Sequence, residues 1–286
     1  MFHIKNIIKA MKDKSPGKSG IRKSIITQMP DIALHKLKNI LNLSMSMGYY
    51  QDFFKIALIC LVGKENKGPT NAINYRPILL IEIPGKIFEK IINERLMLYL
   101  ERNHKLNDNQ YRFHKNRGTQ VAIAKLYETI AVSKHYRQRC NVVCKNIEKA
   151  FDKVWHQGLK YKILHQQLPI IIEKILCNFI VNRKAQIRLN EVVGPLIDLK
   201  SGVPQGSVLS PTLYILYTAD LPPPGQGCID VSFADDITQI IIYPGREKEA
   251  LARKSATEIS RINQYEKAWK IRTNNNKFQL LSISAT

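Results

Sequence analysis

Apolar residues recur along the chain at helical spacing in several segments, and each of these segments predicts a helix. The spacing runs through residues 29–47, where Gly48 is a natural stop, and through residues 118–135. It also follows Pro84, with basic residues Lys86, Lys90, Arg95 and Arg102 outside an apolar face of Ile87, Phe88, Ile91, Ile92, Leu96 and Leu100. Residues 149–168 and 170–181 predict two further helices.

Short apolar runs lie between these segments and predict strands. They cover residues 56–62, 140–144, 185–190, 231–233, 237–243 and 278–284. We expect the run at 185–190 and the last three runs to share one sheet with helices packed on it. Residues 234–236, with the sequence Ala-Asp-Asp, are expected at a hairpin turn between two strands. Interleaved strands and helices without an internal repeat predict a continuous α+β fold.

Charge adds a class of partner to this picture. The 286 residues include 44 Lys and Arg against 23 Asp and Glu, a net charge of +21, while 44% of the residues are hydrophobic. A packed protein with this surplus favours a polyanionic partner, with nucleic acid as the leading candidate. Residues 1–140 carry 25 basic and 10 acidic side chains, so we expect most phosphate contacts there.

Cysteine usage and the start of the chain bear on the compartment. Five scattered cysteines include one close pair, Cys140 and Cys144, which lacks the second pair needed for a zinc site. The first residues develop no signal-like apolar run, and no run reaches the length of a membrane span. We expect a reduced intracellular protein of the nucleus or cytoplasm that has no membrane partner.

Two local motifs carry candidate chemistry. Asp235 and Asp236 offer hard oxygen ligands for Mg²⁺, although an Asp-Asp pair is also typical of an ordinary turn. In residues 201–211, Gly202 and Gly206 permit close backbone approach and Gln205 supplies an amide. Ser207 can cap the helix predicted by the apolar run that follows at 213–217. The same loop is compatible with an ordinary turn and cap.

Longer motifs extend these two. The runs GVPQGSVLSP at 202–211, FADD at 233–236 and IEKAFDKVW at 147–155 resemble the reverse transcriptases of non-LTR (LINE-like, jockey-like) retrotransposons. The same order continues in blocks at residues 14–17, 74–78, 85–90, 109–111 and 117–119. The resemblance therefore covers nearly the whole chain.

The resemblance implies a right-hand polymerase fold. Fingers of helices and strands would occupy residues 1–140, and a palm with an antiparallel sheet flanked by helices would occupy residues 141–286. Little sequence remains for a thumb, which suggests a fragment of a longer polyprotein with flanking domains. The implied activity is RNA-directed DNA polymerisation from an RNA template, a DNA primer or hybrid, and deoxynucleoside triphosphates, with two Mg²⁺ ions or Mn²⁺ in their place.

The resemblance also assigns residues. Asp235 and Asp236 match two metal-binding aspartates, and Asn146 stands where the family has the third. Nearby Glu148 and Asp152 are not expected to substitute for it. Lys277 matches a late palm lysine that assists pyrophosphate departure, and Phe151 matches the side chain that crowds the sugar 2′ position. The other nucleotide-binding positions are Lys64, Arg76, Gln205 and Gly206.

Several positions depart from the family pattern, and together these losses are typical of a decayed copy. Asn146 removes a negative charge from the metal site, Arg112 replaces a glycine, and His114 replaces a basic residue. The block at residues 16–20 reads PGKSG where the family has PGxDG. Two functions stay open: a polymerase weakened by Asn146, and a catalytically dead remnant that binds nucleic acid. A basic binding module unrelated to polymerases would require the whole motif series to be accidental.

Overall fold

The computed structural model describes residues 2–13, 15–63, 65, 68, 70–71, 74–114, 117–245 and 247–284. The chain folds into two compact units, each built from two separate segments. Unit 1 comprises Met1–Asn103 and His156–Leu213, and unit 2 comprises His104–Trp155 and Tyr214–Thr286. The α+β class predicted from the sequence is confirmed, while the boundary between fingers and palm near residue 140 stays a prediction.

Unit 1 contains a mixed sheet. Its strand order is β2 (Tyr75–Leu80), β1 (Ile56–Gly63), β4 (Lys184–Leu189) and β5 (Val192–Val193), and β6 (Ile197–Asp198) also pairs with β4. Strand β1 runs antiparallel to β2 and parallel to β4. Our expectation that residues 185–190 join the sheet of the C-terminal strands is therefore wrong. Ala185 of β4 lies beside Ala57 of β1, and both are fully buried. Strand β4 therefore pairs with β1 because of tertiary packing, which the apolar spacing of β4 alone does not show.

Unit 1 contains the helices expected over residues 29–47, after Pro84 and over residues 170–181, together with two helices before residue 28 that were not predicted. Its helices are α1 (Phe2–Ala10), α2 (Lys23–Thr27), α3 (Asp31–Met47), α4 (Ile83–Arg102), α6 (His156–His165) and α7 (Ile170–Ile180), with the 3₁₀ turn η1 (Asp52–Lys55). Gly48 ends α3 in a left-handed conformation with φ 66°, as predicted. Of the six residues predicted to form the apolar face of α4, five are buried and Ile91 is half-buried. The side chain of Lys86, predicted outside that face, is instead buried, with 8% exposed.

The helix predicted over residues 149–168 begins later than expected. Lys149 has φ 51°, which is incompatible with a right-handed helix, and residues 149–153 form turns. Helix α6 starts only at His156. Phe151 therefore lies in a turn and Val154 just after it, although their spacing matches a helix.

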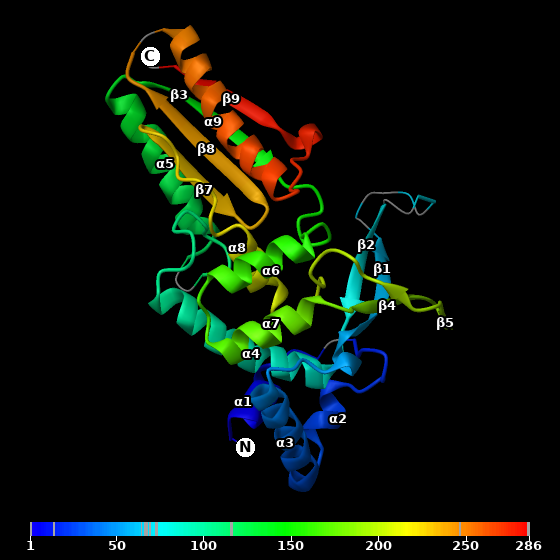
Figure 1. Ribbon diagram of the computed structural model, residues 1–286. Coiled ribbons are helices and arrows are strands. Elements are labelled where there is room, and N and C mark those ends of the chain that lie inside the picture. Colours follow the sequence, from blue (N-terminus) through cyan, green and yellow to red (C-terminus); the bar gives the residue numbers. More distant parts are fainter. Residues whose placement is uncertain are drawn as a thin grey trace. The chain divides into compact units, whose positions relative to one another are not determined.

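Unit 2 is built around an antiparallel sheet. Its order is β7 (Cys228–Phe233), β8 (Asp236–Tyr243), β3 (Arg139–Asn146) and β9 (Gln279–Ile283), preceded by the 3₁₀ turn η3 (Asn275–Lys277). Helix α5 (Thr119–His135) and helix α9 (Lys248–Ala268) cover opposite faces, as Figure 1 shows. Val143 and Ile241 pack with Leu251 of α9, whereas Val142 and Ile240 pack toward α5. Burial on both faces explains why consecutive residues of β8 are apolar from Ile240 to Ile242.

Helix α8 (Ser210–Tyr217) matches the predicted apolar run and lies at the division between the two units. In α5, the apolar residues Val121 and Ala124 are exposed, whereas the polar residues Thr129 and Ser133 are buried. In the part of the chain that the structure describes, helices are too short or too polar to cross a lipid bilayer.

Candidate active site

The two adjacent aspartates lie at the tight turn that joins β7 to β8. Phe233 pairs with Asp236, so Ala234 and Asp235 are the two residues of the turn. Asp236 is the first residue of β8, and it pairs with Asn146, the last residue of β3. The backbone N–H of Ile147 donates to the carbonyl of Asp235 at 2.9 Å. The hairpin and the end of β3 therefore bring Asn146 next to both carboxylates.

The side-chain amide of Asn146 faces the two aspartates. Its Nδ2 lies 2.7 Å from Oδ1 of Asp236 and 3.4 Å from Oδ2 of Asp235. Because carboxylates accept and do not donate, the amide presents its NH₂ group to them. Asn146 and Asp235 are half-buried, and Asp236 is exposed. The position where the resemblance expects a third carboxylate thus holds a hydrogen-bond donor.

The donor set of this site suits Mg²⁺ only in part. Two carboxylates at one turn match the one or two that Mg²⁺ takes from a protein when substrate phosphates and waters complete its shell. Asn146 adds a carbonyl oxygen, but only if its amide gives up the two hydrogen bonds and turns over. Clusters of three or more His, Cys, Asp or Glu side chains suited to a metal do not occur among the described residues.

The two other carboxylates near Asn146 in the sequence are placed differently. Glu148 forms an ion pair with Lys153, with its Oε2 2.7 Å from the ammonium nitrogen. This hydrogen bond lowers the pKa of Glu148. Asp152 lies in the turn that follows, where its backbone N–H donates to the carbonyl of Lys149.

Phe151 packs beside the turn rather than on a helix. Its ring lies 5.1 Å from the ring of Tyr214, with 32° between the planes. Tyr214 is buried, and burial, with the nearby charge of Asp235, raises the pKa of its phenol well above the usual range. Phe151 therefore contacts a tyrosine that lies near Asp235, and its role beside a nucleotide sugar stays a prediction.

Lys277 comes from the segment that extends the sheet. Asn274 donates from its backbone N–H to the carbonyl of Asn146 at 2.7 Å, and η3 with Lys277 follows directly. The side chain of Lys277 is exposed. Its role in pyrophosphate departure stays a prediction.

The remaining candidate residues lie in unit 1, and one of them is outside the residues that the structure describes. Lys64 lies outside the described residues, and the backbone of Arg76 lies in β2 opposite Val62. Gln205 accepts a hydrogen bond at its carbonyl from the backbone N–H of Leu79 at 3.0 Å. Gly206 has φ 117°, a conformation that favours glycine. The loop is therefore fastened to strand β2.

Sequence reasoning missed the residue that holds this loop from the other side. Glu89 of α4 is completely buried, and its Oε2 accepts from the hydroxyl of Ser207 at 2.5 Å and the backbone N–H of Val208 at 2.6 Å. The hydroxyl of Tyr50 donates to the other carboxylate oxygen at 2.8 Å. Ser207, predicted as a cap, does accept from Leu209 N at 3.1 Å. The signal in the sequence was an acidic residue at a position inside the apolar pattern of α4.

The chain matches a known family over most of its length. A family model described as reverse transcriptase (RNA-dependent DNA polymerase) matches residues 63–285. The chain belongs to this family of nucleic-acid polymerases, and the resemblance stated from the sequence is confirmed.

The relatives it matches come from mobile elements. The probable RNA-directed DNA polymerase from transposon X-element of Drosophila melanogaster is 28% identical over 275 residues, covering 95% of this chain and 30% of the relative. The RNA-directed DNA polymerase from mobile element jockey of the same species is 28% identical over 287 residues, covering 96% and 30%. The jockey enzyme of Drosophila funebris is 30% identical over 220 residues, covering 77% and 24%. The chain thus spans less than a third of the length of these relatives.

Proposed function

We propose that this chain is the polymerase region of a non-LTR retrotransposon protein, that it extends a DNA primer on an RNA template, and that Asn146 weakens this activity. The observation that carries the proposal is the junction of β3 with the β7–β8 turn, where Asn146 contacts both Asp235 and Asp236. In a right-hand polymerase, this four-stranded sheet would belong to the palm.

Asp235 and Asp236 would hold Mg²⁺ at this turn. When bound, Mg²⁺ supplies stabilisation of the negative charge that develops on the transferring phosphate. The two carboxylates would hold the cation, and Phe151 would limit the space beside them. The proposal follows the two-metal scheme, in which the two ions bring a charge of about +4 against −2 from the aspartates.

Asn146 affects this site through charge and through hydrogen bonding. A carboxylate in its place would add a third negative charge, whereas the amide adds none. In addition, the NH₂ group of Asn146 occupies carboxylate oxygen atoms that a cation needs. Loss of one preorganised charged group from such a site lowers the rate by about 10²-fold to 10³-fold.

The partners that fit this proposal are an RNA template, a DNA primer or hybrid, and deoxynucleoside triphosphates. The net charge of +21 supports a phosphate-binding surface, and residues 1–140 carry most of the surplus. The length of the relatives supports further domains in the complete protein, which we place inside the cell.

Primer extension on poly(rA)/oligo(dT) with Mg²⁺ and with Mn²⁺ tests the proposal. We expect weak extension by the wild type, extension raised by about 10²-fold in Asn146→Asp, and none in Asn146→Asp combined with Asp235→Asn. The proposal is wrong if Asn146→Asp extends no faster than the wild type although both proteins bind the hybrid.

A second candidate is a nucleic-acid-binding remnant without catalysis. The hydrogen bonds of Asn146 favour it, because they give both carboxylates a partner without a cation. The same assay separates the two functions: the remnant binds the hybrid but extends no primer, with or without Asn146→Asp.

A further inference from the structure

The turn that carries Asp235 has an unusual backbone. Ala234, the residue before Asp235, has φ 58°, in the left-handed region that non-glycine residues rarely adopt. In two-residue hairpin turns, the first central position with positive φ is usually taken by glycine or asparagine. Alanine pays a steric penalty there, so surrounding contacts must hold this conformation.

The side chain of Gln110 supplies such contacts. Its Oε1 accepts from the backbone N–H of Ala234 at 2.9 Å, and its Nε2 lies 3.4 Å from the carbonyl of the same residue. Oε1 also accepts from the backbone N–H of Arg112 at 3.1 Å, and these two donors together define which end of the amide faces the turn. Gln110 is 4% exposed, so these bonds are shielded from water.

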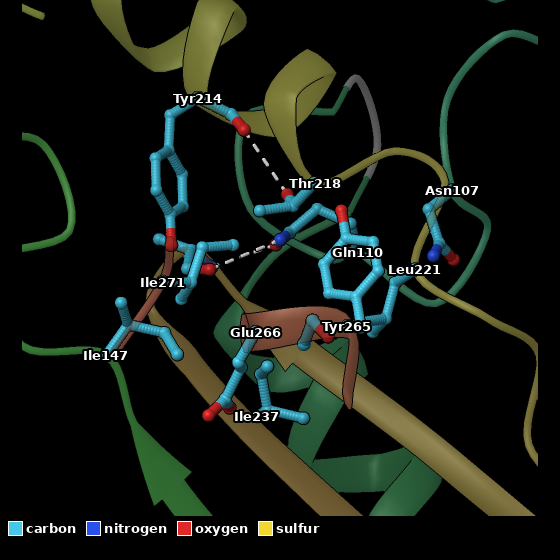
Figure 2. Close-up of a pocket in the computed structure, with 12 residues that line it drawn as sticks. Asn107, Gln110, Ile147, Tyr214, Thr218, Leu221, Ile237, Tyr265, Glu266 and Ile271 are labelled. Atoms are coloured by element: carbon cyan, nitrogen blue, oxygen red, sulfur yellow. Dashed lines mark hydrogen bonds between the residues drawn. The ribbon is translucent and has the colours of Figure 1, made fainter. Parts of the chain in front are cut away.

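Hydrogen bonds to β7 also hold the backbone on both sides of Gln110. Tyr111 donates from its N–H to the carbonyl of Ser232 at 2.8 Å, and the N–H of Ser232 donates to the carbonyl of Asn109 at 2.7 Å. Residues 109–111 therefore add a short parallel bridge to the edge of β7, and the amide of Gln110 extends it to Ala234. Gln110 also lines a small cavity of about 20 Å³ beneath the turn, together with Ile147 and Ile237 (Figure 2).

We propose that Gln110 is a positioning residue of the active site: its side-chain amide holds Ala234 in the left-handed conformation and so sets the positions in which Asp235 and Asp236 meet a divalent cation. The inference rests on the proposed function, because it concerns the same carboxylates. Without the amide, Ala234 relaxes to negative φ, and Asp235, the next residue, turns away from Asn146 and Asp236. Because the Gln110 amide bonds to main-chain atoms of the turn, it acts on the carboxylates through the backbone.

A rescue experiment separates this role from simple packing. Gln110→Met keeps the length and volume of the side chain but loses both hydrogen bonds to Ala234. Glycine adopts positive φ without strain, so Ala234→Gly should restore the turn in the Gln110→Met background. The matched control is Gln239→Met, because Gln239 is 1% exposed in β8 and bonds through its amide to Asp230 at 3.2 Å.

The readout is Mn²⁺ binding followed by electron paramagnetic resonance, with folding checked by circular dichroism. We expect Gln110→Met to raise the Kd for Mn²⁺ about 10-fold or more, as loss of partners that orient metal ligands does, and Ala234→Gly to recover most of that loss. Gln239→Met should leave the Kd within about twofold. An unchanged Kd in Gln110→Met, or a loss that Ala234→Gly does not repair, overturns the inference.

Two further measurements keep the outcomes distinct. If wild-type Mn²⁺ binding does not depend on Asp235, tested with Asp235→Asn, the proposed function fails together with this inference. If Gln110→Met does not fold, amide exchange in the wild type decides: Ala234 N–H must be protected by its bond to Gln110, and exchange as fast as in an unprotected turn contradicts the role.

Discussion

Gly206→Ala is the substitution whose effect on stability follows most directly from the geometry. Gly206 has φ 117°, and a Cβ placed on it would lie 2.6 Å from the carbonyl oxygen of Leu79. Real Cβ atoms do not approach backbone that closely, so the loop or strand β2 must move. This movement strains the bond between Leu79 N and the carbonyl of Gln205, which fastens the loop to the sheet.

Two other glycines of unit 1 separate the cost of backbone strain from the cost of close contact. Gly20 has φ 73° with open space around its Cβ position, and Gly63 has open space without positive φ. Gly20→Ala therefore tests the backbone conformation alone, at about 1–2 kcal/mol. Gly63→Ala should change the free energy of unfolding by less than about 0.5 kcal/mol. Gly206→Ala combines about 1–3 kcal/mol of backbone strain with about 1–3 kcal/mol of overpacking.

The assay is urea unfolding followed by far-UV circular dichroism. Both tryptophans, Trp155 and Trp269, belong to unit 2, so their fluorescence gives a reference transition for the unit that carries no substitution. We expect the loss of stability to increase in the order Gly63→Ala, Gly20→Ala, Gly206→Ala. Equal losses in the last two variants would refute the argument that the carbonyl of Leu79 excludes a side chain at position 206.

Three other expectations concern unit 1 and nucleic acid. Glu89→Gln keeps the shape of the side chain but removes the negative charge that offsets Arg183, which is 1% exposed. Urea unfolding should show that the free energy of unfolding falls by about 3–5 kcal/mol. Adding Arg183→Met should partly reverse this loss. Burial lowers the pKa of His156, so at acidic pH the unfolded chain binds a proton that the folded chain lacks. The free energy of unfolding should therefore fall as the pH drops below about 6.5. His156→Gln should flatten this dependence in unfolding measured from pH 5 to 8. Filter binding of an RNA/DNA hybrid should weaken steeply between about 50 and 200 mM salt, and a salt-independent affinity would contradict a phosphate-binding surface.

Elements whose signal is local could be predicted from the sequence. The turn at Ala234 and Asp235 joins two apolar runs directly, so their antiparallel pairing needs no distant information. Gly48 ends α3 because it adopts positive φ without a steric penalty. Helix α9 has an equally definite structure, but its composition is polar, with few buried apolar residues such as Leu251 and Ile262, and the pattern did not predict it.

Tertiary structure alone decided which strands share a sheet and which polar residues are buried. Strand β4 joins β1 of unit 1 rather than the sheet of β8, because apolar spacing defines a strand but not its partner. The sequence does not show the partners of Glu89 and Gln110, yet each residue is buried and bonded to the backbone of a loop far along the chain. The identity of the aspartates was evident from the sequence. Their arrangement with Asn146 depends on β3 pairing with β8, a contact between residues about 90 positions apart that only the folded chain brings together.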